Sequence, residues 1–308
     1  MVILVGSTGF VGRNLSASYD FDMLCNSKNV AEAFGTHPDL LVYSGVPAEM
    51  FLANTNPDAD KAVIETAATN ISKINPKSLV LISTIAVLDN PVNADEDTII
   101  DTGRLTAYGL NRLSLENTVS DFIPHSHVIR LPALFGEGIK KNFIYDMINY
   151  FPVLLNQAKY DELASKGPVI KESYSLQANG FYKLNVSEDN KPSLKAAFER
   201  SGFSSLNFTD SRSVFQYYNL SYLFEHIKIV LKYDIPLLHL ATEPVSAADV
   251  YEYILGKEFV NELDKPPFNY DFRTKYADIF GGKDGYIFGR GQVLSELKDF
   301  VTRQNMRK

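Results

Sequence analysis

The residues with the clearest chemical meaning stand at the start of the chain, where Gly6, Gly9 and Gly12 are spaced three apart. They follow the short apolar run 2–5 and precede a segment with helical patterning. Glycines placed in this way allow a tight turn, a close approach of the backbone to a phosphate, and close packing of helix on strand. The amino end of the helix then faces the anion with its free N–H groups. The pattern predicts a pyrophosphate-binding turn; the alternative is a glycine-rich turn without a ligand.

The elements that must position this turn follow from hydrophobic patterning. Short apolar runs, typical of strands buried on both faces of a parallel sheet, occur at 2–5, 21–25, 40–43, 79–83 and 128–131. Apolar residues near helical spacing separate several of them, at 58–73 and 105–119. This alternation predicts an α/β fold with a doubly wound parallel Rossmann sheet.

The pattern of apolar and polar residues changes beyond Gly136. Aromatic and polar residues alternate through 171–186, with turn signals at 178–180 and 189–192. These features predict an insertion that carries a hairpin.

The second half then returns to regular patterning. A helical segment, an apolar strand and a Ser-capped helix are expected to rejoin the main sheet, at 220–231, 236–241 and 246–255. We therefore expect a dinucleotide-binding domain and a smaller C-terminal α+β substrate lobe. The first would comprise 1–150 with 213–255, and the second 151–212 with 256–308.

The charge and hydropathy of the chain exclude several partners. The formal net charge is −7, from 30 Lys and Arg against 37 Asp and Glu, so no basic field attracts nucleic acid or an anionic membrane. The longest apolar run, around 79–88, is too short to span a bilayer. Met1 leads straight into a predicted strand, with no signal peptide before it. We expect a cytoplasmic protein that binds neither nucleic acid nor membrane.

Cysteine and histidine usage argues against a metal site. Cys25 is the single cysteine, so the chain has no internal disulfide and no multi-cysteine site, which fits a reducing compartment. His125 and His127 lack further ligands nearby, and the acidic run 95–97 has the character of a solvated loop. We expect no metal.

The glycine turn and three later stretches together resemble the extended short-chain dehydrogenase/reductase family, which contains nucleotide-sugar epimerases, dehydratases and reductases. The stretch 56–67 is similar to the family's helix after the fourth strand, 81–87 to the strand with the active-site serine or threonine, and 130–136 to the strand and turn beside the nicotinamide. They occur in the family's order, firmly to about residue 144 and more weakly beyond. The resemblance implies an enzyme that transfers hydride between NAD(P) and a nucleotide-linked sugar.

The resemblance assigns catalytic roles to Thr84, Tyr108 and Arg112. Tyr108 lies 24 positions after Thr84, close to the family's spacing, and Arg112 stands four residues later where the family has lysine. Residues four apart share one helix face, so Arg112 can stabilise the phenolate of an acid/base tyrosine, although a guanidinium cannot relay a proton. Thr84 would hydrogen-bond the reacting substrate oxygen. The alternatives are an ordinary surface pair and a strand-end hydroxyl satisfied by the protein.

The resemblance also implies which residues contact the cofactor. Asn26, Ser27 and Lys28 occupy the end of the second strand, where a carboxylate would bind the ribose of NAD, and its absence mildly favours NADP over NAD. The remaining expected contacts are Gly6, Ser7, Thr8, Gly9, Phe10, Val11, Ser44, Gly45, Leu131 and Pro132.

Two further residues are similar to substrate-side positions of the family. Arg212 precedes an aromatic strand, where an arginine would clamp a diphosphate with paired donors, and Asn142 resembles another substrate contact. A surface arginine is the alternative. The acidic pair of the 4,6-dehydratases and the Cys–His pair of some epimerases are missing, which leaves reduction, oxidation or 4-epimerisation open.

The resemblance further implies a homodimer through the helix that bears Tyr108. Leu113, Leu115 and Val119 could supply its apolar contacts, unless they face their own sheet. A rival to the enzyme is a non-catalytic NAD(P)-binding redox sensor or scaffold, in which arginine replaced lysine as chemistry was lost. Retention of Thr84 and Tyr108 favours the enzyme.

Overall fold

The computed structural model describes residues 1–307, and the chain divides into two compact units. The first comprises 1–139, 214–245 and 268–296, and the second comprises 140–213, 246–267 and the C-terminal residues from 297.

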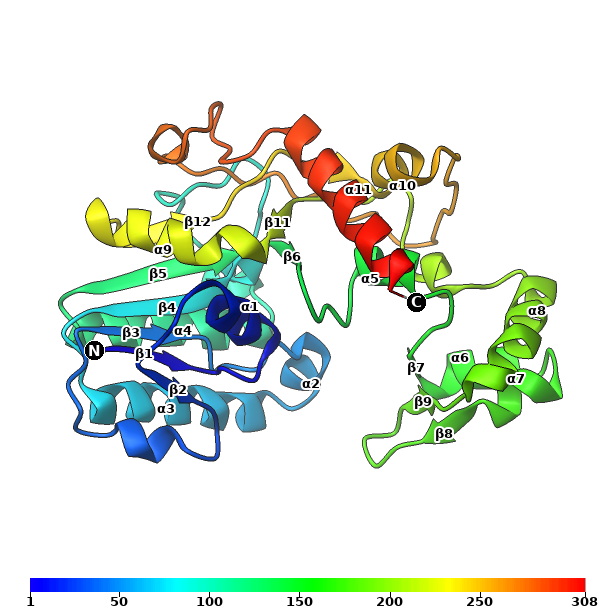
Figure 1. Cartoon of the computed structure of the whole chain (residues 1–308), viewed down its shortest axis with the longest axis horizontal. Helices are drawn as coiled ribbons and strands as arrows, with labels where there is room; N and C mark the ends of the chain where they lie inside the picture. The colour runs from blue at the N-terminus through cyan, green and yellow to red at the C-terminus, as the bar shows by residue number, and fades with distance from the viewer. Residues whose placement is uncertain (308) are drawn as a thin grey trace. The chain divides into compact units, whose positions relative to one another are not determined.

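A six-stranded sheet forms the centre of the first unit (Figure 1). Its order is β12-β5-β4-β3-β1-β2, and all neighbouring strands are parallel. The strands are β1 (Val2–Val5), β2 (Met23–Cys25), β3 (Leu40–Tyr43), β4 (Leu79–Thr84), β5 (Ser126–Leu131) and β12 (Leu237–His239). The predicted doubly wound parallel sheet is confirmed.

Helices cover both faces of this sheet because its strands are apolar on both sides. Leu4 and Val42 belong to one buried core cluster, and their neighbours Ile3 and Leu41 belong to the other. The covering helices are α1 (Phe10–Ser18) and α9 (Leu223–Lys232) on one face, and α3 (Pro57–Ile74) and α4 (Ala107–Phe122) on the other. The predicted helices at 58–73 and 105–119 therefore exist with slightly different ends.

Segments far apart in the sequence complete the first unit. β6 (Ala133–Phe135) pairs in parallel with β11 (Tyr217–Asn219). Beside β11, the buried Gln216 side chain donates to the carbonyl oxygens of Thr242 at 2.6 Å and Phe272 at 2.8 Å, and accepts from the Phe272 N–H at 2.9 Å. One amide side chain thus ties three segments together. β10 (Val214–Phe215) and β13 (Val245–Ser246) form a further two-stranded pair.

The units differ from the predicted boundaries in four places, one of which is Ser213, which belongs to the second unit. Residues 140–150 and 246–255 belong to the second unit, and 268–296 belongs to the first. The Ser-capped helix exists as α10 (Ala247–Leu255), but its first N–H groups bond to carbonyl oxygens of residues 211 and 213, which are part of the second unit. Helix patterning alone could not show which core that helix would join.

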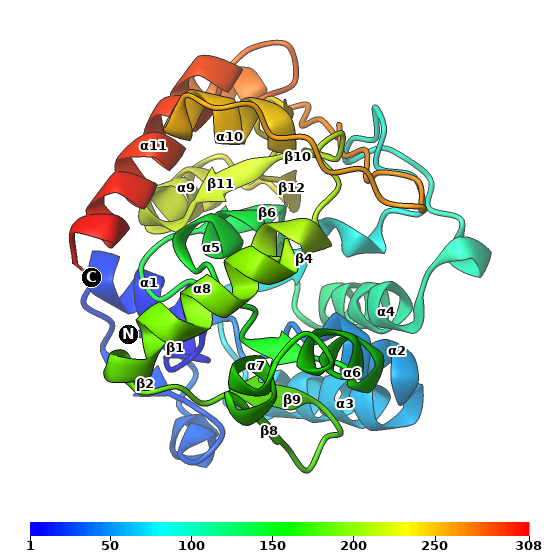
Figure 2. The same cartoon turned by 90° about the vertical axis from the view of Figure 1, so that its right-hand side faces the viewer.

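The second unit contains a small antiparallel sheet, β7-β9-β8, with helices packed beside it (Figure 2). The hairpin β8–β9 confirms the predicted insertion, with Gly180 at φ +80° in its turn. The strands are β7 (Leu154–Leu155), β8 (Tyr174–Leu176) and β9 (Tyr182–Leu184), and the helices around them are α6 (Gln157–Ala164), α7 (Pro168–Glu172) and α8 (Lys191–Ser201). The α-helices not yet named are α2 (Met50–Thr55), α5 (Phe143–Ile148) and α11 (Arg290–Met306), and they do not all belong to the second unit.

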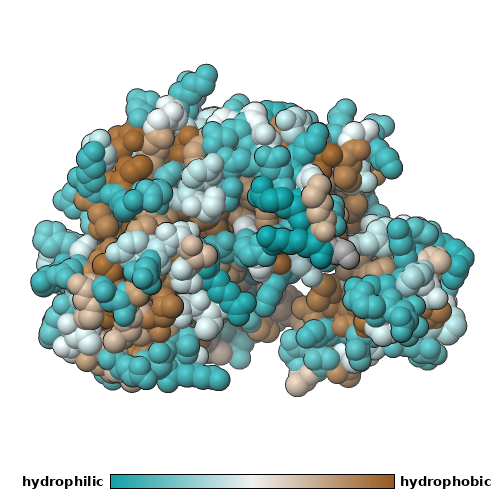
Figure 3. Space-filling view, viewed as in Figure 1, coloured by the Kyte–Doolittle hydropathy of each residue, from teal (hydrophilic) through white to brown (hydrophobic). Residues whose placement is uncertain are grey.

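Apolar residues on the visible face are scattered among hydrophilic ones (Figure 3). Within residues 1–307, no helix is long and apolar enough to cross a membrane. The same residues contain no group of three or more His, Cys, Asp and Glu side chains placed to hold a metal ion.

Candidate active site

The turn after β1 is built so that only glycine fits its first position. Gly6 has φ +93°, and a Cβ atom there would lie 2.5 Å from the backbone carbon and oxygen of Ser44. The N–H groups of Gly6 and Ser7 both donate to the carbonyl oxygen of Cys25, at 2.9 and 3.0 Å. These two donors fix the turn against β2, so an anion would depend on later amides.

The helix that follows presents a bare amino end. Gly9 is the N-cap of α1, no side chain caps the helix, and its first turn has no acidic residue. A Cβ on Gly12 would lie 2.1 Å from the Gly6 oxygen, so this glycine lets α1 approach the turn. Thr8 and Gly9 are exposed. This cradle fits the pyrophosphate of a dinucleotide, which helix N–H groups and the helix dipole would hold.

The other predicted residues of the turn divide between the surface and the core. The Ser7 hydroxyl donates to the carbonyl oxygen of Cys25 at 3.0 Å. Phe10 and Val11 pack their side chains against the core cluster that contains Leu15. A ligand at this turn would therefore meet the backbone of Phe10 and Val11, and their side chains would support the helix.

The loop after β2 lies where the sequence predicts it. β2 ends at Cys25, and the Asn26 side chain accepts the Lys28 N–H at 2.8 Å in a local turn. Ser27 and Lys28 are exposed. The loop itself has no carboxylate, but Glu32 lies close enough to contribute, after burial, to raising the pKa of Cys25.

Four more predicted cofactor contacts stand at the carboxyl ends of neighbouring strands. Ser44 and Gly45 directly follow β3, whereas Leu131 ends β5 and Pro132 follows it. Leu131 pairs in register with Thr84, the last residue of β4. The carboxyl ends of parallel strands share one edge of the sheet, which is where ligands bind in such folds.

Tyr108 and Thr84 meet at this edge. Tyr108 is buried near the start of α4, and the Thr84 hydroxyl lies close enough to lower the pKa of its phenol. The approach of α4 depends on Gly109, since a Cβ there would lie 2.3 Å from the carbonyl oxygen of Ala86. From α2, the Asn54 side chain accepts the Tyr108 N–H at 2.9 Å. Two residues predicted to act together are therefore in contact.

Arg112 lies against the face of the tyrosine ring. Its Cζ atom is 3.9 Å from the Tyr108 ring centroid. One terminal nitrogen is paired with the carboxylate of Asp60 on α3, and the other donates to the Pro47 carbonyl oxygen at 2.8 Å. Asn111 also donates to Asp60, at 2.8 Å. The buried Nε of Arg112 has no partner among the described residues, so the site still has a donor to offer.

The protonation of Tyr108 reflects these neighbours. Burial raises the pKa of the phenol above its usual value of 10, and the negative charge of Asp60 acts in the same direction. The charge of Arg112 and the nearby Thr84 hydroxyl lower the pKa of Tyr108, but burial is the largest effect. Arg112 acts in the predicted direction, yet the phenol stays protonated at neutral pH.

A second ion pair lies further along the same helix. Glu116 and Arg130 are both buried and joined by bonds of 2.6 to 3.2 Å. Ser83, which precedes Thr84, donates to Glu116, and Arg130 also contacts the imidazole Nε2 of His239 at 3.2 Å. Burial and the charge of Arg130 lower the pKa of His239 to about 3, so the imidazole is neutral. These contacts fix the strand end that carries Thr84.

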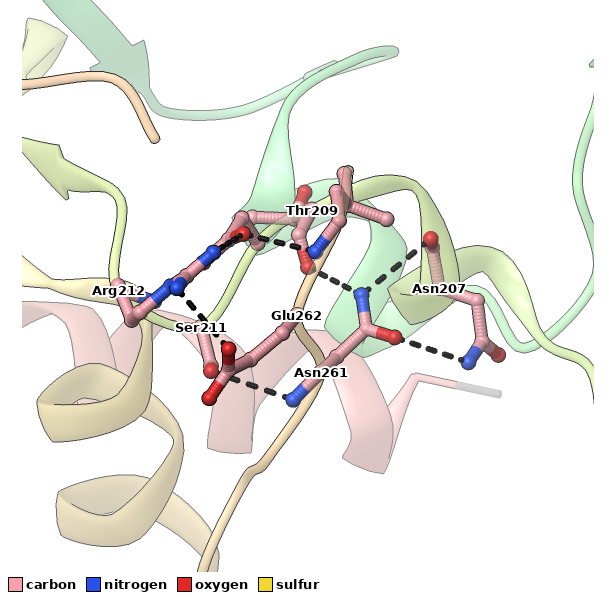
Figure 4. A network of polar contacts seen from close by, with 8 residues as sticks. Asn207, Thr209, Ser211, Arg212, Asn261 and Glu262 are labelled. Carbon is pink, nitrogen blue, oxygen red and sulfur yellow. Dashed lines mark hydrogen bonds and ion pairs between the residues drawn. The ribbon is translucent and has the colours of Figure 1, made fainter. Parts of the chain in front are cut away.

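The contacts of Arg212 differ from those expected of a diphosphate clamp. Its guanidinium donates to Asp210 at 2.9 and 2.7 Å and to Glu262 at 2.9 Å (Figure 4). Asp210 also accepts the Leu263 N–H at 2.9 Å, and Asn261 bonds to neighbouring backbone. Through Glu262, and through Asp210, the arginine holds the segment 261–263 in place within the second unit. Its paired donors already face carboxylates, which supports a structural role.

Asn142 also has a local structural role. Its side-chain oxygen accepts the N–H groups of Ile144 and Tyr145, at 3.0 and 3.2 Å, and so caps α5. Its φ of +97° is unusual for a residue other than glycine. The geometry explains this asparagine as a helix cap.

The apolar residues expected at a dimer contact are buried within the chain. Leu113, Leu115 and Val119 are all buried, and the last two pack in the cluster with α3. Leu115 and Val119 therefore face their own sheet, as the alternative interpretation expected. Leu110 and Phe122 are the exposed apolar residues of α4, at 44% and 38%.

Sequence reasoning missed three residues that build the site. Asp60 resembles any acidic residue in a first helical turn, and Gly109 and Asn54 belong to no motif. The only signal was indirect: an arginine in place of lysine requires a partner when it is buried. Nothing in the sequence shows that Asp60, 52 positions before Arg112, is that partner.

No protein-family model and no curated protein matches the chain. Solved structures resemble it over nearly its whole length. dTDP-4-dehydrorhamnose reductase from Bacillus anthracis, in complex with NADP, is 14% identical, covers 98% of this chain and 97% of its own, and has a TM-score of 0.63. RMD from Pseudomonas aeruginosa, complexed with NADPH, is 12% identical over 100% and 99%, with a TM-score of 0.63.

An epimerase is similar to the same extent. UDP-N-acetylglucosamine 4-epimerase from Methanobrevibacter ruminantium, in complex with UDP-N-acetylmuramic acid, is 11% identical, covers 100% of this chain and 98% of its own, and has a TM-score of 0.60. At such identities the likeness concerns the fold. The chain has the fold of nucleotide-sugar reductases and epimerases, which is the fold expected of an extended short-chain dehydrogenase/reductase.

Proposed function

We propose that the chain is a nicotinamide-dependent oxidoreductase or epimerase in which Tyr108 exchanges a proton with the substrate and Thr84 orients the reacting oxygen. The observation that carries the proposal is the proximity of these two side chains, at the sheet edge where the glycine turn also lies. A sensor or scaffold needs no such pair.

Each residue of the proposed site has a separate role in the reaction. A bound nicotinamide would give or take the hydride. The amino end of α1 would hold the pyrophosphate, and the unpartnered Nε of Arg112 is a donor for a polar group beside Tyr108. Tyr108 would move one proton to or from the substrate oxygen, which Thr84 holds in line.

The proposed substrate class is supported by the solved structures that have the same fold. Proteins of this fold act on dTDP- and UDP-linked sugars, as their names state. We therefore propose a nucleotide-linked sugar as substrate, with NADP preferred to NAD because the loop after β2 offers Lys28 and no carboxylate. A homodimer is part of the proposal, with Leu110 and Phe122 as candidate contacts in place of the buried leucines.

The decisive experiment separates cofactor binding from turnover. Calorimetry with NADPH and NADH tests the glycine turn, and a panel of nucleotide-linked sugars and 4-keto sugars, followed by absorbance at 340 nm and product analysis, tests catalysis. Tight cofactor binding without any turnover across the panel would favour the sensor. If the folded protein binds neither NADPH nor NADH at millimolar concentrations, both the enzyme and the sensor are refuted. Light scattering reports the oligomeric state.

A further inference from the structure

We infer that Asp60 is a positioning residue for proton transfer: its carboxylate holds Arg112 over the Tyr108 ring, offsets part of the arginine charge and so favours the proton-donating form of Tyr108, which suits the site to reducing a carbonyl group. The inference rests on the proposed function and adds to it a residue and a direction of reaction.

The first support is the geometry of the guanidinium. Asp60 takes one terminal nitrogen of Arg112 and the Pro47 carbonyl oxygen takes the other, so the plane is fixed over the Tyr108 ring. The side chains of Asp60 and Arg112 are 11% and 5% exposed. Charges that are largely shielded from water interact strongly, and neither side chain can turn to solvent without leaving the other without its counter-charge.

The second support is the balance of charge around the phenol. The charged groups that act on Tyr108 are Arg112 from its own helix and Asp60 from α3, and Thr84 contributes a hydroxyl from β4. Arg112 alone would favour the phenolate. Asp60 opposes it and acts with burial, which raises the pKa of Tyr108.

The third step is chemical. In a reduction, the carbonyl carbon gains a hydride, with its two electrons, from a reduced nicotinamide. The carbon–oxygen π bond breaks, and the oxygen forms an O–H bond with the proton that leaves Tyr108 Oη. Solvent then returns a proton to the phenolate. Oxidation, or epimerisation that begins with oxidation, needs Tyr108 as phenolate at the outset, which burial disfavours and the charge of Asp60 disfavours further.

The test measures the phenol directly, without cofactor or substrate. Protein labelled with ¹³C at tyrosine Cζ is titrated by NMR, and Tyr108→Phe identifies the Tyr108 signal. Asp60→Asn keeps an oxygen for Arg112 but removes the charge, so the Tyr108 midpoint should move to lower pH. Asp58→Asn removes an exposed charge from the same helical turn and should leave it unchanged.

Reciprocal variants keep the test decisive if Asp60→Asn is poorly folded. Arg112→Gln should move the Tyr108 midpoint to higher pH, and Asp60→Glu should keep it near the parent value. An unchanged or raised midpoint in folded Asp60→Asn overturns the inference, as does an unchanged midpoint in Arg112→Gln. A protein without turnover would refute the proposed function and leave these titrations interpretable.

The same variants make a prediction for turnover. Reductive kcat should fall as pH rises through the Tyr108 pKa, because only the protonated phenol donates. In Asp60→Asn that fall should begin at lower pH, with the KM for the cofactor little changed. Asp58→Asn should retain the parent profile. A profile that is identical in Asp60→Asn and the parent would overturn the role of Asp60.

Discussion

Gly109 faces the carbonyl oxygen of Ala86 so closely that a Cβ atom at Gly109 would lie 2.3 Å from that oxygen. The contact sets the distance between α4 and the end of β4, and therefore between Tyr108 and Thr84. Alanine is the better helix former, so substitution would normally stabilise a helix by up to about 1 kcal/mol.

We expect Gly109→Ala to do the opposite. The added methyl group must push α4 away from backbone that cannot move freely, which lowers the melting temperature and separates Tyr108 from Thr84. Turnover should fall at least about 100-fold, the lower range for a misplaced acid/base group. Gly291→Ala, in α11, adds a Cβ that meets nothing within 4 Å. It should keep both stability and activity. Full activity in Gly109→Ala would show that the close approach is unimportant.

Tyr108→Phe should abolish turnover and leave cofactor affinity nearly unchanged. In the proposed mechanism the lost hydroxyl carries the proton and does not bind a phosphate, and positioned acid/base catalysis contributes roughly 10² to 10⁴ in rate. Steady-state kinetics measures the loss of turnover, and calorimetry measures the cofactor affinity. A Phe variant with parental kcat would remove Tyr108 from the mechanism.

Arg112→Lys should also lose activity, although charge is conserved. A lysine ammonium is compact and cannot hold Asp60, the Pro47 carbonyl oxygen and the ring face at once, as the guanidinium does. Comparing kcat with thermal stability would separate a local effect from unfolding. Equal or higher activity would mean that arginine merely substitutes for the family's lysine.

Gly9→Ala should weaken cofactor binding in a folded protein. Its Cβ would lie 3.3 Å from the Gly6 oxygen, a tight but tolerable contact, and would stand where a phosphate must approach. Loss of one hydrogen bond to a charged group costs roughly 1.5–3 kcal/mol, or about tenfold or more in Kd. Gly103→Ala meets the Asp101 carboxylate at the same 3.3 Å and is the matched control. Unchanged Kd in Gly9→Ala would place the cofactor elsewhere.

Lys28→Gln should reduce the preference for NADPH over NADH. Lys28 is exposed, and an exposed ion pair is worth up to roughly 1 kcal/mol, so the ratio of affinities should fall about threefold to fivefold. The effect should diminish as salt is added. Lys232→Gln, an exposed lysine of α9, serves as control. An unchanged ratio would exclude Lys28 from the choice of cofactor.

Glu116→Gln should destabilise the fold more than most single substitutions. The change leaves the Arg130 charge buried without its counter-charge, which costs roughly 3–5 kcal/mol of unfolding free energy. Urea unfolding would measure the loss, and Glu65→Gln, at an exposed position of α3, should show little. A loss below about 1 kcal/mol would mean that the ion pair is not needed for stability.

The sequence predicted features that depend on local pattern and missed those that depend on three-dimensional partners. β1 and β3 were predicted residue for residue, because a strand buried on both faces is a continuous apolar run. The contact of Thr84 with Tyr108 followed from a resemblance in spacing. The partner of Arg112 could not be predicted, since Asp60 has the appearance of an ordinary acid at a helix start. The surroundings of Arg212 were hidden for the same reason, because Glu262 lies 50 positions away.

The bonds of Gln216 bear on the order in which the chain can be completed during synthesis. The side chain of Gln216 can form its two hydrogen bonds with the backbone of Phe272 only after Phe272 has been synthesised. β1, in contrast, is the first strand to leave the ribosome. The glycine turn therefore belongs to a unit that cannot close until most of the chain has left the ribosome. Until then, the buried cluster that Phe272 forms with Ile85, Leu88 and Ala241 is incomplete, and its apolar residues are exposed to other chains. Expression at lower temperature, or with added chaperones, should therefore raise the yield of native protein.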